Sequence, residues 1–251
     1  SSNTVLVKAV YENYKSNPEE FVDHLKDYGL TKPLGLSIKG EGKPYVPHPD
    51  DKNWSNISLP WMAFGYGVSI TPLQTLTYYN AVANNGVMVK PMFVSEIKEL
   101  NRTIKKYNTE VINPKICSKE TVLKLQAVLK NVVKNGTGKK LYSKDFSMAG
   151  KTGTAQANYN RKGGVEKHYI SSFVGYFPAD KPQYTCIVVI RTKPHAASHF
   201  GGTLAAPVFR EIATKLHAMY VQQENPSLYV AKKDSSAYYY AGYSSDIKNV
   251  F

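Results

Sequence analysis

The sequence predicts an α+β fold, in which an antiparallel sheet is flanked by helices. Helical spacing and capping signals recur within the first 135 residues. Two apolar runs of strand character, HYISSFVGYFPAD and QYTCIVVIRTK, then follow the short stretch AGKTGTAQ. Because consecutive strands with short connections pair side by side, these three segments indicate an antiparallel meander. The run GGTLAAPVFREIATKLHAMY predicts a closing helix whose apolar face lies on that sheet.

The first two helices are predicted from their spacing and their end signals. Residues 4–15 gather apolar side chains on one helical face. In NPEEFVDHLKDYG, Asn17 is the expected N-cap, Pro18 fits the first helical position, and Gly29 can end the helix in a left-handed turn. Both segments therefore read as helices joined by a short connection.

Two further helices follow a long irregular segment. Residues 31–60 are rich in Gly, Pro, Lys and Asn, which predicts a loop. In TPLQTLTYYNAVANNG, Thr71 and Gln74 form the pattern of a capping box at the start of a helix. The segment VMVKPMFVSEIKEL suggests short extended pieces, and the apolar spacing over residues 118–135 predicts a longer helix.

Composition limits the classes of function. The chain has 251 residues with 42% hydrophobic content, enough for a real core. The lysines behind its net charge of +13 are scattered, so a solvated basic surface is favoured over a nucleic-acid site, while an anionic cell-envelope partner stays open. No apolar run approaches the ~18 residues of a membrane helix. Neither the cysteines, Cys117 and Cys186, nor the histidines show metal-ligand spacing, so we expect no metal and no cofactor.

The stretch AGKTGTAQ combines a lysine, two hydroxyls and glycines on one short strand. Gly153 leaves room for a ligand backbone to pair with this strand. Thr152 and Thr154 are two positions apart, so their hydroxyls face the same side, while simple alternation puts Lys151 on the other side. The backbone N–H of Thr154 can then point at a carbonyl oxygen, as one donor of an oxyanion hole. These features predict an edge strand that binds an extended ligand.

The pattern extends well beyond this strand. Ser1-Ser2-Asn3 has the form S-x-N, AGKTGTAQ contains K-T-G, and GYGVSITPLQ, NGTGKKLYSKDF and GGTLAAPVFREIA surround them. Together these segments resemble the transpeptidase domain of class B penicillin-binding proteins, and the form GYG-x-S-x-TPLQ resembles the division-type branch. The resemblance covers residues 1 to about 220. It implies a partial transpeptidase domain over residues 1–220 and a linker or tail over residues 221–251, leading to a possible C-terminal module.

The resemblance also implies that the nucleophile is missing. In this family the nucleophilic serine belongs to an S-x-x-K motif upstream of S-x-N, whereas this chain begins at S-x-N. The segment from Ser95 to Lys98 fits the letters, but it follows the TPLQ helix in an extended context, so we do not assign it as the nucleophile. The implied fold is therefore a sheet lacking its upstream strands beside a helical lobe, with apolar surface left exposed.

The roles of the site residues follow from the resemblance. A peptidoglycan stem peptide ending in D-Ala-D-Ala is expected to lie antiparallel along the strand of Lys151, which supplies positive potential. Ser1 is expected to relay a proton to the leaving D-Ala, and Asn3 to bind the substrate amide. Thr152 and Thr154 are expected to bind the terminal carboxylate of the peptide, or the carboxylate of a β-lactam.

The implied function is that of a penicillin-sensitive peptidoglycan D,D-transpeptidase that cross-links stem peptides through a serine acyl-enzyme during cell division. The fragment alone is expected to be inactive and soluble. The implied partners are stem peptides, β-lactams, the missing N-terminal part of the same protein and division proteins, with no nucleic acid. The resemblance places the intact protein on the outer face of the bacterial cytoplasmic membrane, held by an N-terminal helix.

Two alternatives stay open. One is a non-catalytic module of the same fold that senses β-lactams or acts as a scaffold. The other is a D,D-carboxypeptidase or a β-lactamase, against which the long segment between Asn3 and Lys151 and the TPLQ helix both count.

Overall fold

The computed structural model describes residues 3–157 and 166–221 of the chain. The chain divides into two compact units, residues 1–212 and residues 213–251, and the helix α6 (Gly201–Leu216) runs across the division. A short π-helix, η2 (His217–Val221), follows it. All other described helices and strands, apart from η2, belong to the first unit.

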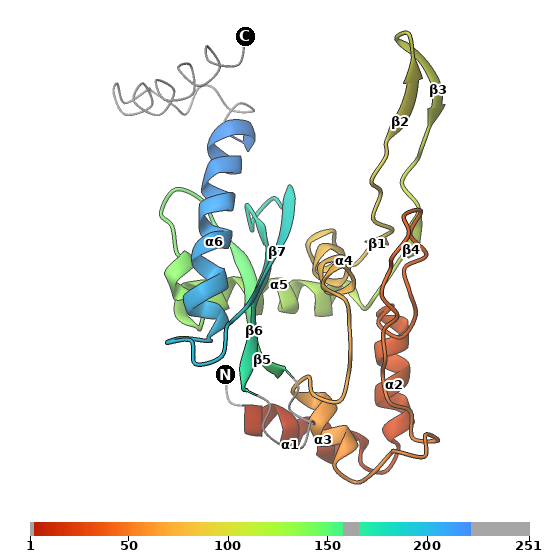
Figure 1. The fold of residues 1–251 in the computed structure, drawn as a ribbon, viewed down its shortest axis with the longest axis vertical. Helices are drawn as coiled ribbons and strands as arrows, with labels where there is room; N and C mark the ends of the chain where they lie inside the picture. The colour runs from red at the N-terminus through yellow and green to blue at the C-terminus, as the bar shows by residue number, and fades with distance from the viewer. Residues whose placement is uncertain (1–2, 158–165, 222–251) are drawn as a thin grey trace. The chain divides into compact units, whose positions relative to one another are not determined.

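The sheet that carries the site is a three-stranded antiparallel meander (Figure 1). It consists of β5 (Ala149–Ala157), β6 (His168–Phe177) and β7 (Tyr184–Arg191), in the order β5-β6-β7. All pairs are antiparallel, as the short connections predict. Among the described strands, β5 pairs on one side only, so its other side is an open edge.

Helices cover both faces of this sheet. The helix α5 (Lys119–Asn135) packs against β5. On the opposite face Phe209 of α6 lies with its ring 4.7 Å from that of Phe173 and 5.7 Å from that of Phe177. All three of these rings are fully buried. Burial of such rings contributes much of the hydrophobic stabilisation of a domain, so the sheet is held firmly against α6.

The core on the other face joins α4, α5 and the sheet. The helix α4 (Pro72–Ala83) contacts both β6 and β7. Its residues Ala81 and Val82 pack with Leu129 of α5 and with Ala149 and Tyr176 of the sheet. Burial raises the pKa of the Tyr176 hydroxyl to about 12.

The N-terminal helices agree with the sequence prediction in position. The helix α1 (Asn3–Tyr14) is followed by α2 (Pro18–Asp27), and Gly29 has a positive φ of 72° just after it. Asn17 occupies the N-cap position as predicted, but its side chain makes no capping hydrogen bond.

The start of α4 matches the predicted capping box. The Thr71 hydroxyl accepts a hydrogen bond from the N–H of Gln74 at 3.1 Å, and the Gln74 side chain accepts one from the N–H of Thr71 at the same distance. The Gln74 amide also donates to the backbone oxygen of Lys32 at 2.9 Å. One buried side chain therefore fixes both the helix start and the preceding loop.

The segment from residue 31 to residue 60 is more ordered at its end than predicted. A six-residue helix, α3 (Ser58–Ala63), begins within it, and Tyr45 forms an isolated antiparallel bridge with Ser69. The helix α3 contacts α1. The sequence missed α3 because six residues are too few to show a helical period.

The chain between α4 and α5 forms two small sheets. The strands β1 (Met88–Val89) and β4 (Val111–Asn113) pair with each other, and so do β2 (Glu96–Glu99) and β3 (Arg102–Lys106). The turn of the β2–β3 hairpin has positive φ at Leu100 and Asn101, as a two-residue hairpin loop requires. The sequence predicted extended pieces up to Leu100 but missed the returning strands.

Neither a membrane helix nor a metal cluster is found in the described part of the chain. No helix within residues 3–157 and 166–221 is long and apolar enough to cross a bilayer. The same residues contain no group of three or more His, Cys, Asp or Glu side chains able to hold a metal ion. Cys117 and Cys186 are free thiols, both partly buried, and burial raises the pKa of each.

Candidate functional site

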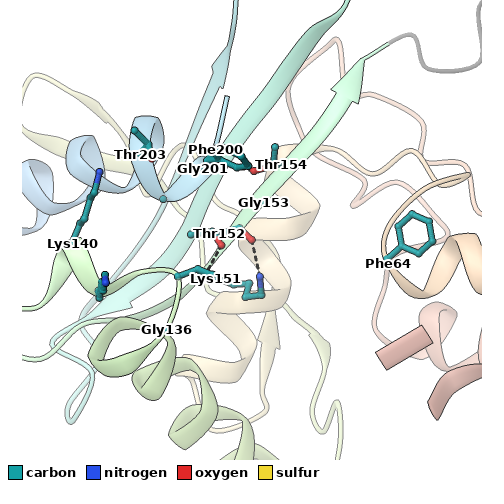
Figure 2. A pocket seen from close by; sticks show the side chains of 13 residues that line it. Phe64, Gly136, Lys140, Lys151, Thr152, Gly153, Thr154, Phe200, Gly201 and Thr203 are labelled. Atoms are coloured by element: carbon teal, nitrogen blue, oxygen red, sulfur yellow. Dashed lines mark hydrogen bonds between the residues drawn. The ribbon is translucent and has the colours of Figure 1, made fainter. Parts of the chain in front are cut away.

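A cavity of about 500 Å³ lies where the edge of β5 meets the start of α6 and the turn after α5 (Figure 2). The short 3-10 helix η1 (Lys139–Leu141) forms part of that turn. The described residues that line the cavity are Phe64, Gly136, Thr137, Lys139, Lys140, Lys151, Thr152, Gly153, Thr154, Phe200, Gly201, Gly202 and Thr203.

Lys151 lies half-buried on β5 at this cavity. Its Nζ donates a hydrogen bond to the backbone oxygen of Thr152 at 2.9 Å (Figure 2). Burial lowers the pKa of this ammonium from its ordinary value of 10.5, because a charged amine loses solvation there. The Lys151 side chain thus places its own positive charge beside the unpaired edge of β5.

The hydroxyl of Thr152 lies 2.9 Å from the hydroxyl of Thr137. Thr137 sits between Gly136 and Gly138, whose backbone N–H groups both donate to the oxygen of Val132 at the end of α5. A Cβ on Gly136 would come within 2.9 Å of the Val132 backbone. Glycine therefore permits the tight turn that brings Thr137 to β5.

The hydroxyl of Thr154 accepts a hydrogen bond from the backbone N–H of Gly201 at 3.1 Å. This contact ties the first residue of α6 to β5. A Cβ on Gly201 would overlap the backbone oxygens of Gly153 and Ser172, so only glycine allows the helix to approach so closely. The hydrogen of the Thr154 hydroxyl remains able to donate to a ligand.

The open edge of β5 offers backbone groups to the cavity. In an antiparallel strand the N–H and C=O of one residue point to the same edge, and successive residues alternate. The N–H of Gln156 donates to the Tyr66 hydroxyl at 3.0 Å, and the oxygen of Thr152 accepts from Lys151, so both point away from β6. The alternation therefore turns the N–H and C=O of Thr154 to the same edge.

Gly153 has a packing role that the sequence did not reveal. It pairs with Ser172 of β6. A Cβ at this position would overlap the Ser172 hydroxyl oxygen. The missing side chain thus fits a close contact within the sheet, in addition to the predicted approach of a ligand backbone.

The structure brings together four of the six predicted site residues. Lys151, Thr152, Gly153 and Thr154 line one cavity. Ser1 lies outside the described residues, and Asn3 is the first residue of α1. The predicted relation of Ser1 and Asn3 to the lysine thus stays a prediction.

Several residues of the cavity and of the neighbouring edge of β5 were missed from the sequence. Thr137, Lys139 and Lys140 lie in the segment NGTGKK. Its two glycines were the signal of a tight turn that the sequence offered. Tyr66 lies between Gly65 and Gly67, which have φ of 96° and 76°. In both places glycines flank a residue that is aimed at β5, but the sequence does not tell which strand the loop meets.

Several known proteins are similar to most of this chain. The profile described as "Penicillin binding protein transpeptidase domain" matches residues 1–214. Stage V sporulation protein D of Bacillus subtilis is 31% identical over 195 residues, covering 77% of this chain and 30% of its own length. Penicillin-binding protein PbpB of Mycolicibacterium smegmatis is 33% identical over 211 residues, covering 79% of this chain and 32% of its own length. The chain thus spans about a third of the length of these relatives.

Solved structures show the same fold. Penicillin-binding protein 3 of Mycobacterium tuberculosis in its apo form matches with a TM-score of 0.69 and 30% identity, over 83% of this chain and 47% of that chain. The complex of the same protein with aztreonam matches with a TM-score of 0.70 and 29% identity, over 89% of this chain and 50% of that chain. Penicillin-binding protein 2B of Streptococcus pneumoniae matches with a TM-score of 0.70 at 24% identity, over 87% and 38%, which supports the fold alone.

Proposed function

Because the chain belongs to the penicillin-binding protein transpeptidase family, we propose that it carries part of the active site of a serine-type D,D-transpeptidase that cross-links peptidoglycan stem peptides during cell division. The complete protein supplies the nucleophilic serine and its lysine from a segment that precedes Ser1. β-Lactams inhibit it by acylating the same serine. The intact protein is held at the outer face of the bacterial cytoplasmic membrane.

One observation carries the proposal. The open edge of β5 presents Lys151, the hydroxyls of Thr152 and Thr154 and the outward backbone of Thr154 to a single cavity. An extended peptide can add to such an edge as an antiparallel strand. Its carbonyl oxygen then accepts a hydrogen bond from the N–H of Thr154, in the place of an oxyanion.

The reaction proceeds in two halves. The serine gives up its proton to its lysine partner, its oxygen bonds to the carbonyl carbon of the penultimate D-Ala, and the C–N bond to the last D-Ala breaks. The leaving nitrogen takes up a proton through Ser1, while Asn3 holds the substrate amide. In the second half an amine of another stem peptide bonds to the same carbon and gives up a proton. The ester C–O bond then breaks, and the serine is regenerated with a new peptide cross-link.

Lys151, Thr152 and Thr154 stabilise negative charge on the bound donor peptide. The Lys151 ammonium raises the local positive potential and orients Ser1. Thr152 and Thr154 donate to the terminal carboxylate of the donor peptide. The Thr154 hydroxyl keeps its hydrogen because it only accepts from Gly201, and the Thr152 hydroxyl keeps its hydrogen when Thr137 donates in their contact.

The experiment that tests the proposal is acylation by a fluorescent penicillin. We expect the complete protein to form a covalent adduct that survives denaturation, and this 251-residue chain alone to form none. Lys151→Ala in the complete protein should reduce the acylation rate by about 100-fold, as expected for loss of one electrostatic contact at a reacting centre. A complete protein that never forms the adduct would refute the enzyme and its penicillin sensitivity.

The same preparation separates the alternatives. Rapid turnover of nitrocefin would identify a β-lactamase, and release of D-Ala without cross-linking would identify a carboxypeptidase. A stable adduct in a protein that consumes no stem peptide would identify a sensor or scaffold.

A further inference from the structure

Lys151 is the cation that β5 brings to the cavity, but its side chain does not lie on the same face of the sheet as those of Thr152 and Thr154. Thr152 pairs with Phe173, whose ring faces Phe209 of α6, so the Thr152 side chain lies on the α6 face of the sheet. Thr154 shares that face, because its hydroxyl accepts from Gly201. Lys151 alternates to the other face and holds its ammonium on the oxygen of Thr152.

The two hydroxyls are also already engaged. The Thr152 hydroxyl is hydrogen-bonded to the hydroxyl of Thr137, and the Thr154 hydroxyl accepts a hydrogen bond from the N–H of Gly201. The Thr154 hydroxyl can donate one hydrogen bond to a carboxylate, and the Thr152 hydroxyl can do so when Thr137 donates to it, but neither carries charge. A carboxylate that leaves water for this face therefore needs positive potential from elsewhere.

Lys139 and Lys140 are placed to supply that potential. Both line the same cavity as Thr152 and Thr154, and none of the described residues that line it is acidic. Figure 2 shows the side chain of Lys140 reaching toward the first turn of α6, near Thr203. Both lysines are exposed, so they stand at the rim of the cavity.

The backbone of this lysine pair is anchored. The two residues begin the 3-10 helix η1, whose third residue, Leu141, is fully buried. Arg210 of α6 donates through Nη1 to the backbone oxygen of Lys140 at 3.1 Å. The turn after α5 therefore presents both charges at a fixed place beside α6.

We propose that Lys139 and Lys140 form a cationic rim that draws the terminal carboxylate of the donor peptide, or of a β-lactam, onto the hydroxyls of Thr152 and Thr154. This inference rests on the proposed function and adds Lys139 and Lys140 to the residues that capture the carboxylate of the acyl donor. Because the rim is exposed, its effect falls mainly on capture of the ligand and weakens with salt.

The test uses the complete protein and a charge series at the rim. Wild type is compared with Lys139→Gln/Lys140→Gln and with Lys139→Glu/Lys140→Glu. The second-order rate of acylation by benzylpenicillin is measured at 20 mM and 500 mM NaCl. We expect about a fivefold loss for the Gln pair at low salt, a larger loss for the Glu pair, and differences that shrink at high salt. The limiting acylation rate at saturation should change little.

A matched series controls for net charge. Lys134 and Lys144 are equally exposed lysines that line a separate hollow. Lys134→Gln/Lys144→Gln removes the same charge, and we expect its acylation rate to stay within about twofold of wild type. The methyl ester of benzylpenicillin, which has no carboxylate, should react equally with all four proteins.

The outcomes separate this inference from the function on which it rests. If wild type is not acylated at all, the proposed function fails. If wild type is acylated but the rim series and the control series lose rate equally, or the ester follows the acid, the rim has no part in carboxylate recognition. A loss confined to the limiting rate would also overturn the inference, because a steering charge acts on capture.

Discussion

The protonation of Lys151 is coupled to folding because the side chain is half-buried. Burial lowers its pKa in the folded state, whereas the unfolded chain keeps a pKa near 10.5. The unfolded state therefore binds this proton more tightly. Between the lowered pKa and 10.5 the unfolded chain holds more protons than the folded one, so the contribution of Lys151 to the free energy of unfolding rises with pH.

A variant without the amine should lack this dependence. The quantity of interest is the free energy of unfolding of the wild type minus that of Lys151→Met. We expect this difference to increase as pH rises from 7 to 10. Urea unfolding at a series of pH values measures it, and the other titrating groups cancel in the difference. A difference that stays constant over this range would mean that the ammonium is as well solvated in the fold as in the unfolded chain.

Single residues of the site could be predicted only where a local pattern carried the information. Lys151, Thr152 and Thr154 were found because they occur together in one short strand. Lys139 and Lys140 were missed because nothing in NGTGKK tells which strand the turn meets. The contact between the hydroxyls of Thr137 and Thr152 joins residues from two different elements, and such contacts depend on packing rather than on sequence spacing.

The starts of α4, α5 and α2 show where a capping residue predicted from the sequence does or does not form its hydrogen bond. At α4 the predicted capping box is present in full. At α5 the Ser118 hydroxyl accepts from the N–H of Thr121 at 3.1 Å. At α2 the residue type at the N-cap is equally suitable, yet Asn17 makes no capping bond. A sequence rule identifies the residue that can cap, while the local backbone decides whether its side chain reaches the N–H.

These two caps provide a paired test. Ser118→Ala removes a hydrogen bond at the start of α5 and should lower the free energy of unfolding by about 1 kcal/mol. Asn17→Ala removes none and should stay within about 0.5 kcal/mol of wild type. Chemical denaturation of both variants measures the difference. Equal losses would show that Asn17 caps α2 in solution.

Elements of weak pattern were the ones that the sequence missed. The strand β3 reads RTIKK and is exposed throughout, so no apolar alternation marks it. The sheet β5-β6-β7 was predicted in order and direction because β6 and β7 are long and apolar. Long elements with an apolar pattern were therefore predictable, whereas short or fully exposed ones such as α3 and β3 were not.

At the level of the entire chain, charge is the dominant feature. The net charge of +13 at pH 7 makes the folded state repel itself more than the expanded unfolded state does. Surface ion pairs such as Lys124–Glu120, at 2.6 Å, and Lys26–Asp23, at 3.6 Å, have exposed side chains and contribute little against this. Salt should therefore stabilise the protein, because screening of the general repulsion outweighs the loss of these pairs.

This balance predicts a dependence on salt that disappears at the isoelectric point. Raising NaCl from 20 mM to 300 mM at pH 7 should raise the Tm by about 3 °C, which corresponds to about 1 kcal/mol for a chain of this size. At pH 9.5, near the isoelectric point of the sequence, the same addition should have little effect. Differential scanning calorimetry at both pH values measures the two shifts. An equal rise at pH 9.5 would point to a general salting effect on apolar surface, since repulsion between like charges is nearly absent there.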